Sequence, residues 1–92
     1  MQDGELTAEL LFKLYRKGIW GNRHTPIKNL YHILSKINIK ESKKATKELS
    51  NLNWIQLKKS TGEIHISLNP HKKNEIRNFI LKVLKIPTEL LK

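Results

Sequence analysis

Lysines gather in two short segments of the chain, and their chemistry suits contacts with phosphate groups. Lys43, Lys44 and Lys47 lie in one stretch, and Lys58 and Lys59 are adjacent further on. A lysine ammonium binds phosphate as a flexible point charge, whereas the arginine guanidinium makes the bidentate contacts that read guanine. Because the chain has 15 lysines and 3 arginines, we expect binding to a polyphosphate with little direct reading of bases.

The overall charge points in the same direction. The chain carries a formal charge of +10, from 18 lysines and arginines against 8 aspartates and glutamates. A positive field of this kind raises association rates and gives an affinity for polyphosphates that does not depend on sequence. Lysine also accumulates through genome bias, or together with glutamate in heat-adapted proteins. Glutamate is not enriched to match here, so we favour a functional origin for the basic excess.

The first lysine segment belongs to a predicted helix. Ala45, Leu49 and Leu52 recur at spacings of four and three, which predicts an α-helix over about residues 39–52 with these side chains inward. A step of 100° per residue then defines an outer face that carries no acid. That face consists of Lys43, Thr46, Lys47 and Ser50, with Lys44 and Asn51 on one flank.

Both ends of this helix have recognisable signals. Asn38 and Glu41 have the spacing of a capping box, in which each side chain satisfies a free backbone N–H of the first turn. Asn53 follows the last periodic leucine, and asparagine tolerates the left-handed conformation that ends a helix sharply. A strand can therefore begin directly after Asn53.

A β-hairpin is predicted over about residues 54–68. Apolar residues in this segment alternate with a period of two, at Ile55, Leu57, Ile64, Ile66 and Leu68. The segment Lys59-Ser60-Thr61-Gly62 would form the loop, because its glycine supplies a positive φ. Alternation turns Lys58 to the outer face and leaves Lys59 in the loop.

Apolar residues at helical spacing predict three further helices, over about residues 5–17, 26–35 and 70–85. Thr7 is a candidate cap for the first of them. The apolar pair within residues 19–22 is flanked by glycines and suits a brief strand that pairs with the hairpin.

The start of the second helix combines a cap with basic neighbours. Thr25 can cap, and Pro26 suits the first helical position. A helix N-terminus presents free N–H groups and a positive dipole end, so Arg23 and His24 beside it would form a phosphate clamp. A cap with solvated neighbours explains the same residues equally well.

The small residue, the spaced leucines, the helix stop and the Gly-turned hairpin together resemble the recognition helix and wing of a winged helix-turn-helix domain. Two helical segments precede this unit and one follows, as in that superfamily. The resemblance implies binding to duplex DNA through the third helix and the wing, with Thr46, Ser50 and Asn51 nearest the base edges. The candidate nucleic-acid-binding residues are Arg23, His24, Thr25, Lys43, Lys44, Thr46, Lys47, Ser50, Asn51, Lys58 and Lys59.

A narrower resemblance rests on two short segments. Arg23-His24-Thr25 before Asn29-Leu30, and Ser67-Leu68-Asn69-Pro70 after the hairpin, are similar to short winged-helix proteins of archaea. These segments imply a fold and no particular activity.

Signals of catalysis, cofactors or metals are missing from the sequence. It has no Gly-rich phosphate loop, no nucleophile elbow and no cysteine. The histidines lack metal-ligand spacing and are expected on the surface or in caps; they are His24, His32, His65 and His71. We therefore expect no enzyme, no cofactor and no metal site.

Length and hydropathy complete the prediction. The 92 residues suffice for one domain, mainly α-helical with a small antiparallel hairpin, and no segment approaches the roughly 20 apolar residues of a membrane span. We expect a cytoplasmic, nucleoid-associated DNA-binding protein, either a transcriptional regulator or an architectural factor. A homodimer through the C-terminal helix would double its phosphate contacts. The alternatives are a protein–protein adaptor with a solvated basic face, and an RNA-binding winged helix.

Overall fold

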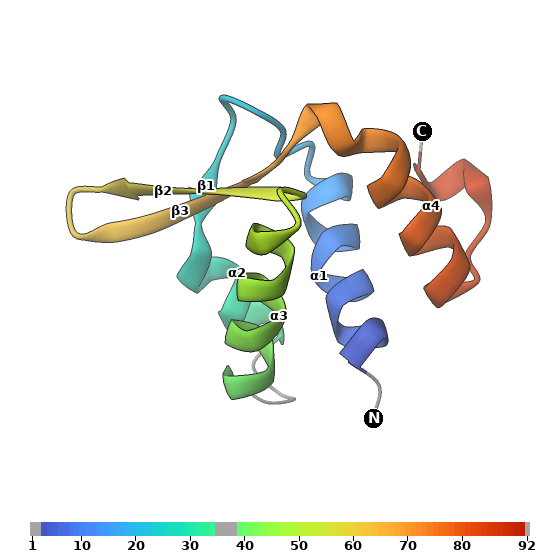
Figure 1. The fold of residues 1–92 in the computed structure, drawn as a ribbon, viewed down its shortest axis with the longest axis horizontal. Helices are drawn as coiled ribbons and strands as arrows, with labels where there is room; N and C mark the ends of the chain where they lie inside the picture. The colour runs from blue at the N-terminus through green and yellow to red at the C-terminus, as the bar shows by residue number, and fades with distance from the viewer. Residues whose placement is uncertain (1–2, 35–38, 92) are drawn as a thin grey trace.

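The computed structural model describes residues 3–34 and 39–91, with side chains described for residues 4–30 and 40–91. The fold is mainly helical, with one small three-stranded antiparallel sheet (Figure 1). The helices are α1 (Asp3–Arg16), α2 (Ile27–Leu34), α3 (Ile39–Asn51) and α4 (Lys73–Leu84), with 3₁₀ turns at Pro70–Lys72 and Thr88–Leu91. The strands are β1 (Thr25–Pro26), β2 (Ile55–Ser60) and β3 (Glu63–Leu68).

Helix α1 packs against both α3 and α4 and lies between them (Figure 1). Its leucine stripe is fully buried at Leu10, Leu11 and Leu14, as expected from helical spacing. Thr7 does not cap this helix, because α1 begins at Asp3 and Thr7 is a buried residue within it.

The sheet has the strand order β1-β3-β2, so β3 is its middle strand. The first strand is not the expected segment 19–22, in which Trp20 makes only an isolated bridge to Leu68. Thr25 and Pro26 take that place instead, with Thr25 opposite Ile66. The residue before a proline is driven out of the helical region, and an edge strand tolerates the missing proline N–H. The predicted helix cap at Thr25 is therefore wrong, and α2 begins at Ile27.

Helix α3 ends as predicted, but its buried stripe differs in part from the predicted one. Asn53 has a φ of 63°, and Trp54 N–H donates to the Leu49 carbonyl at 3.0 Å, which is the long bond of a Schellman motif. Leu52 is 55% exposed, contrary to the prediction that it faces inward. The buried stripe is Ser42, Ala45, Thr46 and Leu49. Asn38, the expected cap, lies outside the described residues.

The strands of the hairpin extend further, and its turn is tighter, than predicted. Thr61 and Gly62 form the turn, with φ values of 40° and 80°, as a two-residue turn that matches the twist of the strands requires. Lys59 therefore belongs to β2, directly opposite Ile64. The predicted loop position of Lys59 is wrong, and its face is fixed by the register.

The C-terminal segment packs back on the domain. Asn69 Oδ1 accepts a hydrogen bond from the His71 N–H at 3.0 Å, and Pro70 opens the 3₁₀ turn that leads into α4. Beyond α4, Leu91 is buried, and the Tyr15 hydroxyl donates to its carbonyl at 3.2 Å. The final turn thus covers α1.

Two leucines near the end of α3 test this orientation of the helix. Leu49→Ala should lower the free energy of unfolding by about 2–4 kcal/mol, because it opens a cavity beneath α3. Leu52→Ala removes the same atoms from a side chain that is 55% exposed and should cost much less. Chemical denaturation of both variants measures the difference. Equal losses would mean that Leu52 is buried and that α3 is rotated relative to this structure.

Candidate nucleic-acid interface

A groove separates α3 from the β-hairpin, and it collects much of the predicted binding face. It is about 470 Å³ in volume, and we call it the α3–hairpin groove. Its lining residues are Ile27, Lys28, Lys43, Thr46, Lys47, Ser50, Asn51, Leu57 and Ile64. The groove therefore unites five candidates from α3 with a lysine from α2 that the sequence did not single out.

Lysines stand on the walls of this groove. Lys43 and Lys47 are exposed on α3, and Lys28 is exposed at the start of α2. Lys59 lies on the same face of the hairpin as Leu57 and Ile64, because it is two residues from Leu57 and directly opposite Ile64. A phosphate backbone laid along the groove would meet positive charge from both sides.

The floor of the groove is apolar. Leu57 and Ile64 are each 43% exposed, although alternation places both on the core face of the hairpin. The hairpin projects beyond the helices (Figure 1), so its tip has no helix beneath it to cover these side chains. The sequence pattern predicted the face correctly, but it contained no information on how far the helices extend.

Not every predicted contact residue of α3 reaches the groove as a free side chain. Thr46 is only 3% exposed, and its hydroxyl donates to the Ser42 carbonyl at 2.8 Å, a back-bond common for threonine within helices. Its expected contact with base edges is therefore wrong. Ser50 is half-buried and Asn51 is exposed, so Asn51 is the most accessible of the three residues expected nearest the base edges. Lys44 lies on the opposite flank, beside a small hollow next to the first turns of α1.

Arg23, His24 and Thr25 do not form a clamp at a helix N-terminus, because β1 separates the first two from α2. Thr25 is half-buried in β1. His24 instead contacts His65 of β3, with the two Nδ1 atoms 2.6 Å apart.

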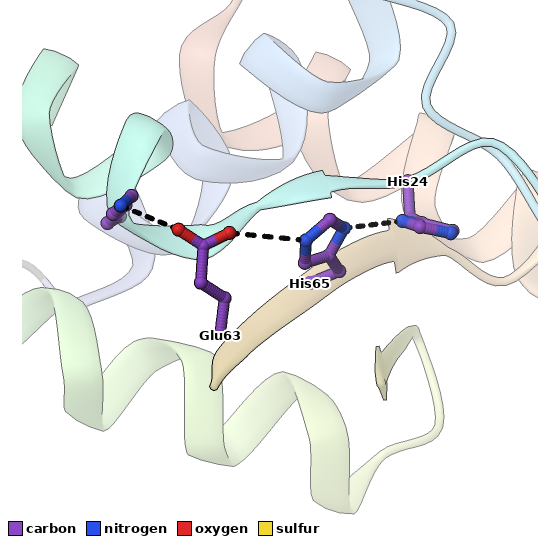
Figure 2. A network of polar contacts seen from close by, with 4 residues as sticks. His24, Glu63 and His65 are labelled. Carbon is purple, nitrogen blue, oxygen red and sulfur yellow. Dashed lines mark hydrogen bonds and ion pairs between the residues drawn. The ribbon is translucent and has the colours of Figure 1, made fainter. Parts of the chain in front are cut away.

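A polar network runs across the outer face of the sheet, the face opposite the groove. Glu63 Oε2 pairs with Lys28 Nζ at 2.6 Å, and Glu63 Oε1 accepts from His65 Nε2 at 3.5 Å. Figure 2 shows Glu63, His65 and His24 in a row along this face. Lys28, and to a lesser extent His65, holds the pKa of the Glu63 carboxyl below its ordinary value.

Sequence reasoning missed this network, since His24 and His65 are 41 residues apart. The period of two was the one available signal, because it puts Glu63 and His65 on one face of a strand. Lys58, directly opposite His65, shares that outer face. The two adjacent lysines of the hairpin therefore point to opposite sides of the sheet.

No group of three or more histidine, cysteine, aspartate or glutamate side chains within residues 3–34 and 39–91 is arranged to hold a metal ion. None of the helices in that part of the chain is both long and apolar enough to cross a membrane.

Comparison with protein-family models, with curated proteins and with solved structures finds no match to this chain.

The ion pair of Glu63 makes stability depend on pH. A carboxyl whose pKa is lowered by folding stabilises the protein above its unfolded pKa, near 4.5, and this contribution is lost as the pH falls through the lower folded value. Glu63→Gln should therefore lower the melting temperature slightly at pH 6 and by less at about pH 2.5. In a protein that also carries Lys28→Met, Glu63→Gln should lower the melting temperature at pH 6 by a smaller amount. A pH-independent difference between wild type and Glu63→Gln would contradict the pairing.

Proposed function

We propose that this protein is a winged-helix, double-stranded DNA-binding protein that docks the α3–hairpin groove and its lysines on the duplex. The arrangement of elements supports the fold. Two helices, α1 and α2, precede α3, a hairpin and a further helix follow it, and a brief strand before α2 pairs with the hairpin. This is the order that the resemblance to winged-helix domains implies.

The observation that carries the proposal is the convergence of lysines from three elements on one groove. Lys43 and Lys47 of α3 and Lys28 of α2 line it, and Lys59 of β2 faces the same side. Lys28 is paired with Glu63, so the remaining positive charge at the groove lies on α3 and the hairpin. Neutralising phosphates with such side chains releases counterions, which gives affinity without sequence preference.

Aromatic burial favours duplex DNA over single-stranded RNA. Unstacked bases need exposed aromatic rings to stack on. The described aromatic side chains are all buried in the core or packed against it: Phe12, Tyr15, Trp20, Trp54 and Phe79. The described side chains thus offer the RNA-binding alternative no fully exposed phenylalanine, tyrosine or tryptophan ring.

A protein–protein adaptor is the second candidate, and one observation favours it. The exposed Leu57 and Ile64 on the floor of the groove are more typical of contacts with a protein than with phosphates. Duplex DNA binding distinguishes the two candidates, because negligible binding at low salt would remove the DNA proposal and leave the adaptor.

Within the DNA proposal, an architectural, nucleoid-associated role fits better than reading of a long operator. Asn51 is the exposed amide on α3, and Thr46 is occupied by its bond to Ser42.

A homodimer through the C-terminal helix would use the exposed face of α4 and Leu90. Its test is the mass in solution by light scattering.

Salt dependence measures how many phosphates the groove engages. If Lys43, Lys47 and Lys59 each neutralise one phosphate, the slope of log K against log salt should be about −3. Lys47→Ala should weaken binding to all duplex sequences alike and make the slope shallower by about one unit. Lys82→Ala makes the same charge change on α4 and is the matched control. Identical slopes for wild type and Lys47→Ala would exclude α3 as the contact.

The register of the hairpin gives a second, sharper comparison. Lys59 faces the groove and Lys58 the outer face of the sheet, although the two are adjacent in sequence. Lys59→Ala should therefore weaken duplex binding several-fold, because it removes the contact with about one phosphate. Lys58→Ala should weaken duplex binding by less. Fluorescence anisotropy with a short labelled duplex at moderate salt measures both. A larger loss for Lys58→Ala than for Lys59→Ala would mean that the DNA lies on the other face of the sheet.

A further inference from the structure

The outer face of the sheet contains a second hollow, separate from the α3–hairpin groove. It is about 280 Å³ in volume and lies between the loop before β1 and the base of the hairpin. The polar residues that line it are Gln56, Lys58 and Ser67 of β2 and β3, and Asn22 and His24 of the loop; Gly21 and Leu57 complete the lining. Alternation puts the three polar strand residues on the face opposite Ile55 and Ile66, which are buried in the core. A ligand here would not touch α3.

The chemistry of this hollow is that of a donor-rich site. Lys58 brings a positive charge, and Asn22 brings an amide. Ser67 Oγ donates to Gln56 Oε1 at 3.4 Å, which leaves the Gln56 NH₂ group to donate elsewhere. None of the described residues that line the hollow is acidic. Donors around a single lysine suit an oxyanion better than a cation or an apolar molecule.

His24 can add a donor to this set, because its contact with His65 orients its ring. Its Nδ1 lies 2.6 Å from His65 Nδ1, so one of the two nitrogens must donate and the other accept. His65 Nε2 is directed at the Glu63 carboxylate at 3.5 Å, an arrangement that keeps the proton of His65 on Nε2 and leaves Nδ1 as the acceptor. His24 Nδ1–H then donates to His65 (Figure 2).

His24 Nε2 is the ring nitrogen that the contact with His65 leaves for a ligand. A further proton held by the histidine pair can lie on His24 Nε2, or on His65 Nδ1 with His24 Nδ1 as the acceptor and the His24 proton on Nε2. In both arrangements the contact with His65 is kept and His24 donates from Nε2. The Glu63 carboxylate, itself paired with Lys28 at 2.6 Å, is the counter-charge at the other end of this row.

We propose that the outer-face hollow is a phosphate-binding site in which the Lys58 ammonium and His24 Nε2–H hold the phosphate group, with the amides of Asn22 and Gln56 as further donors. The group can belong to a free phosphate-bearing small molecule or to a DNA backbone that wraps onto this face. The proposal goes beyond the DNA contacts of the α3–hairpin groove, because it uses the opposite face of the sheet.

The test is a titration of the full chain with inorganic phosphate at constant ionic strength, followed by amide NMR, with chloride as the control anion. Saturable shifts should appear at residues 21–24, 56–58 and 67. His24→Gln and Lys58→Ala should each weaken phosphate binding about tenfold, as loss of a hydrogen bond to a charged group does. Lys82→Ala on α4 is the matched charge control and should bind like wild type. The wild-type-like spectrum of each variant outside the site verifies its fold.

A duplex titration of the same variants identifies the source of the phosphate. Free phosphate that binds with the stated dependence on His24 and Lys58 supports a small-molecule ligand. Duplex binding that depends on His24 and Lys58, without binding of free phosphate, supports a backbone phosphate in the same site. If neither probe depends on these two residues, the proposal is wrong, whatever the α3–hairpin groove does with DNA.

Discussion

The middle position of β3 in the sheet is the constraint on which the rest of the molecule depends. Ile66 and Leu68 of this strand are fully buried, and they anchor the sheet to the core beneath it. Because side chains alternate along a strand, this anchoring turns Glu63, His65 and Ser67 to the outer face. A slip of one residue would bury those polar groups, so the register is strongly fixed. Both binding surfaces proposed for the molecule follow from it.

The same register separates the two lysines of the hairpin. With Leu57 opposite Ile66, Lys59 lies on the face of the hairpin that borders the groove, and Lys58 lies on the face of the histidine pair. A basic dipeptide that looks like one patch in the sequence thus serves two surfaces. The tight turn at Thr61 and Gly62 is what extends β2 far enough to fix Lys59 in this way.

Much of the fold could be predicted from the sequence. The long periodic segments gave α1, α3 and α4 to within a few residues, and the alternating segment gave the hairpin. Two local rules gave wrong predictions. The first predicted a helix start at Thr25-Pro26, whereas pairing with β3 holds this segment in a strand. The second was the hydrophobic period of α3, which counts apolar residues only. It predicted the buried stripe in part, because two residues of that stripe, Ser42 and Thr46, are polar. The contact of His24 with His65 is long-range, and local patterns contain no information about it.

The central claim is that duplex DNA lies along the α3–hairpin groove, and mapping of amide chemical shifts on a short duplex tests it most directly. The account predicts that the largest changes fall on Lys43, Lys47 and Asn51 of α3 and on Lys59 of β2, with α4 unaffected. Changes confined to α4, or no saturable change at low salt, would contradict it.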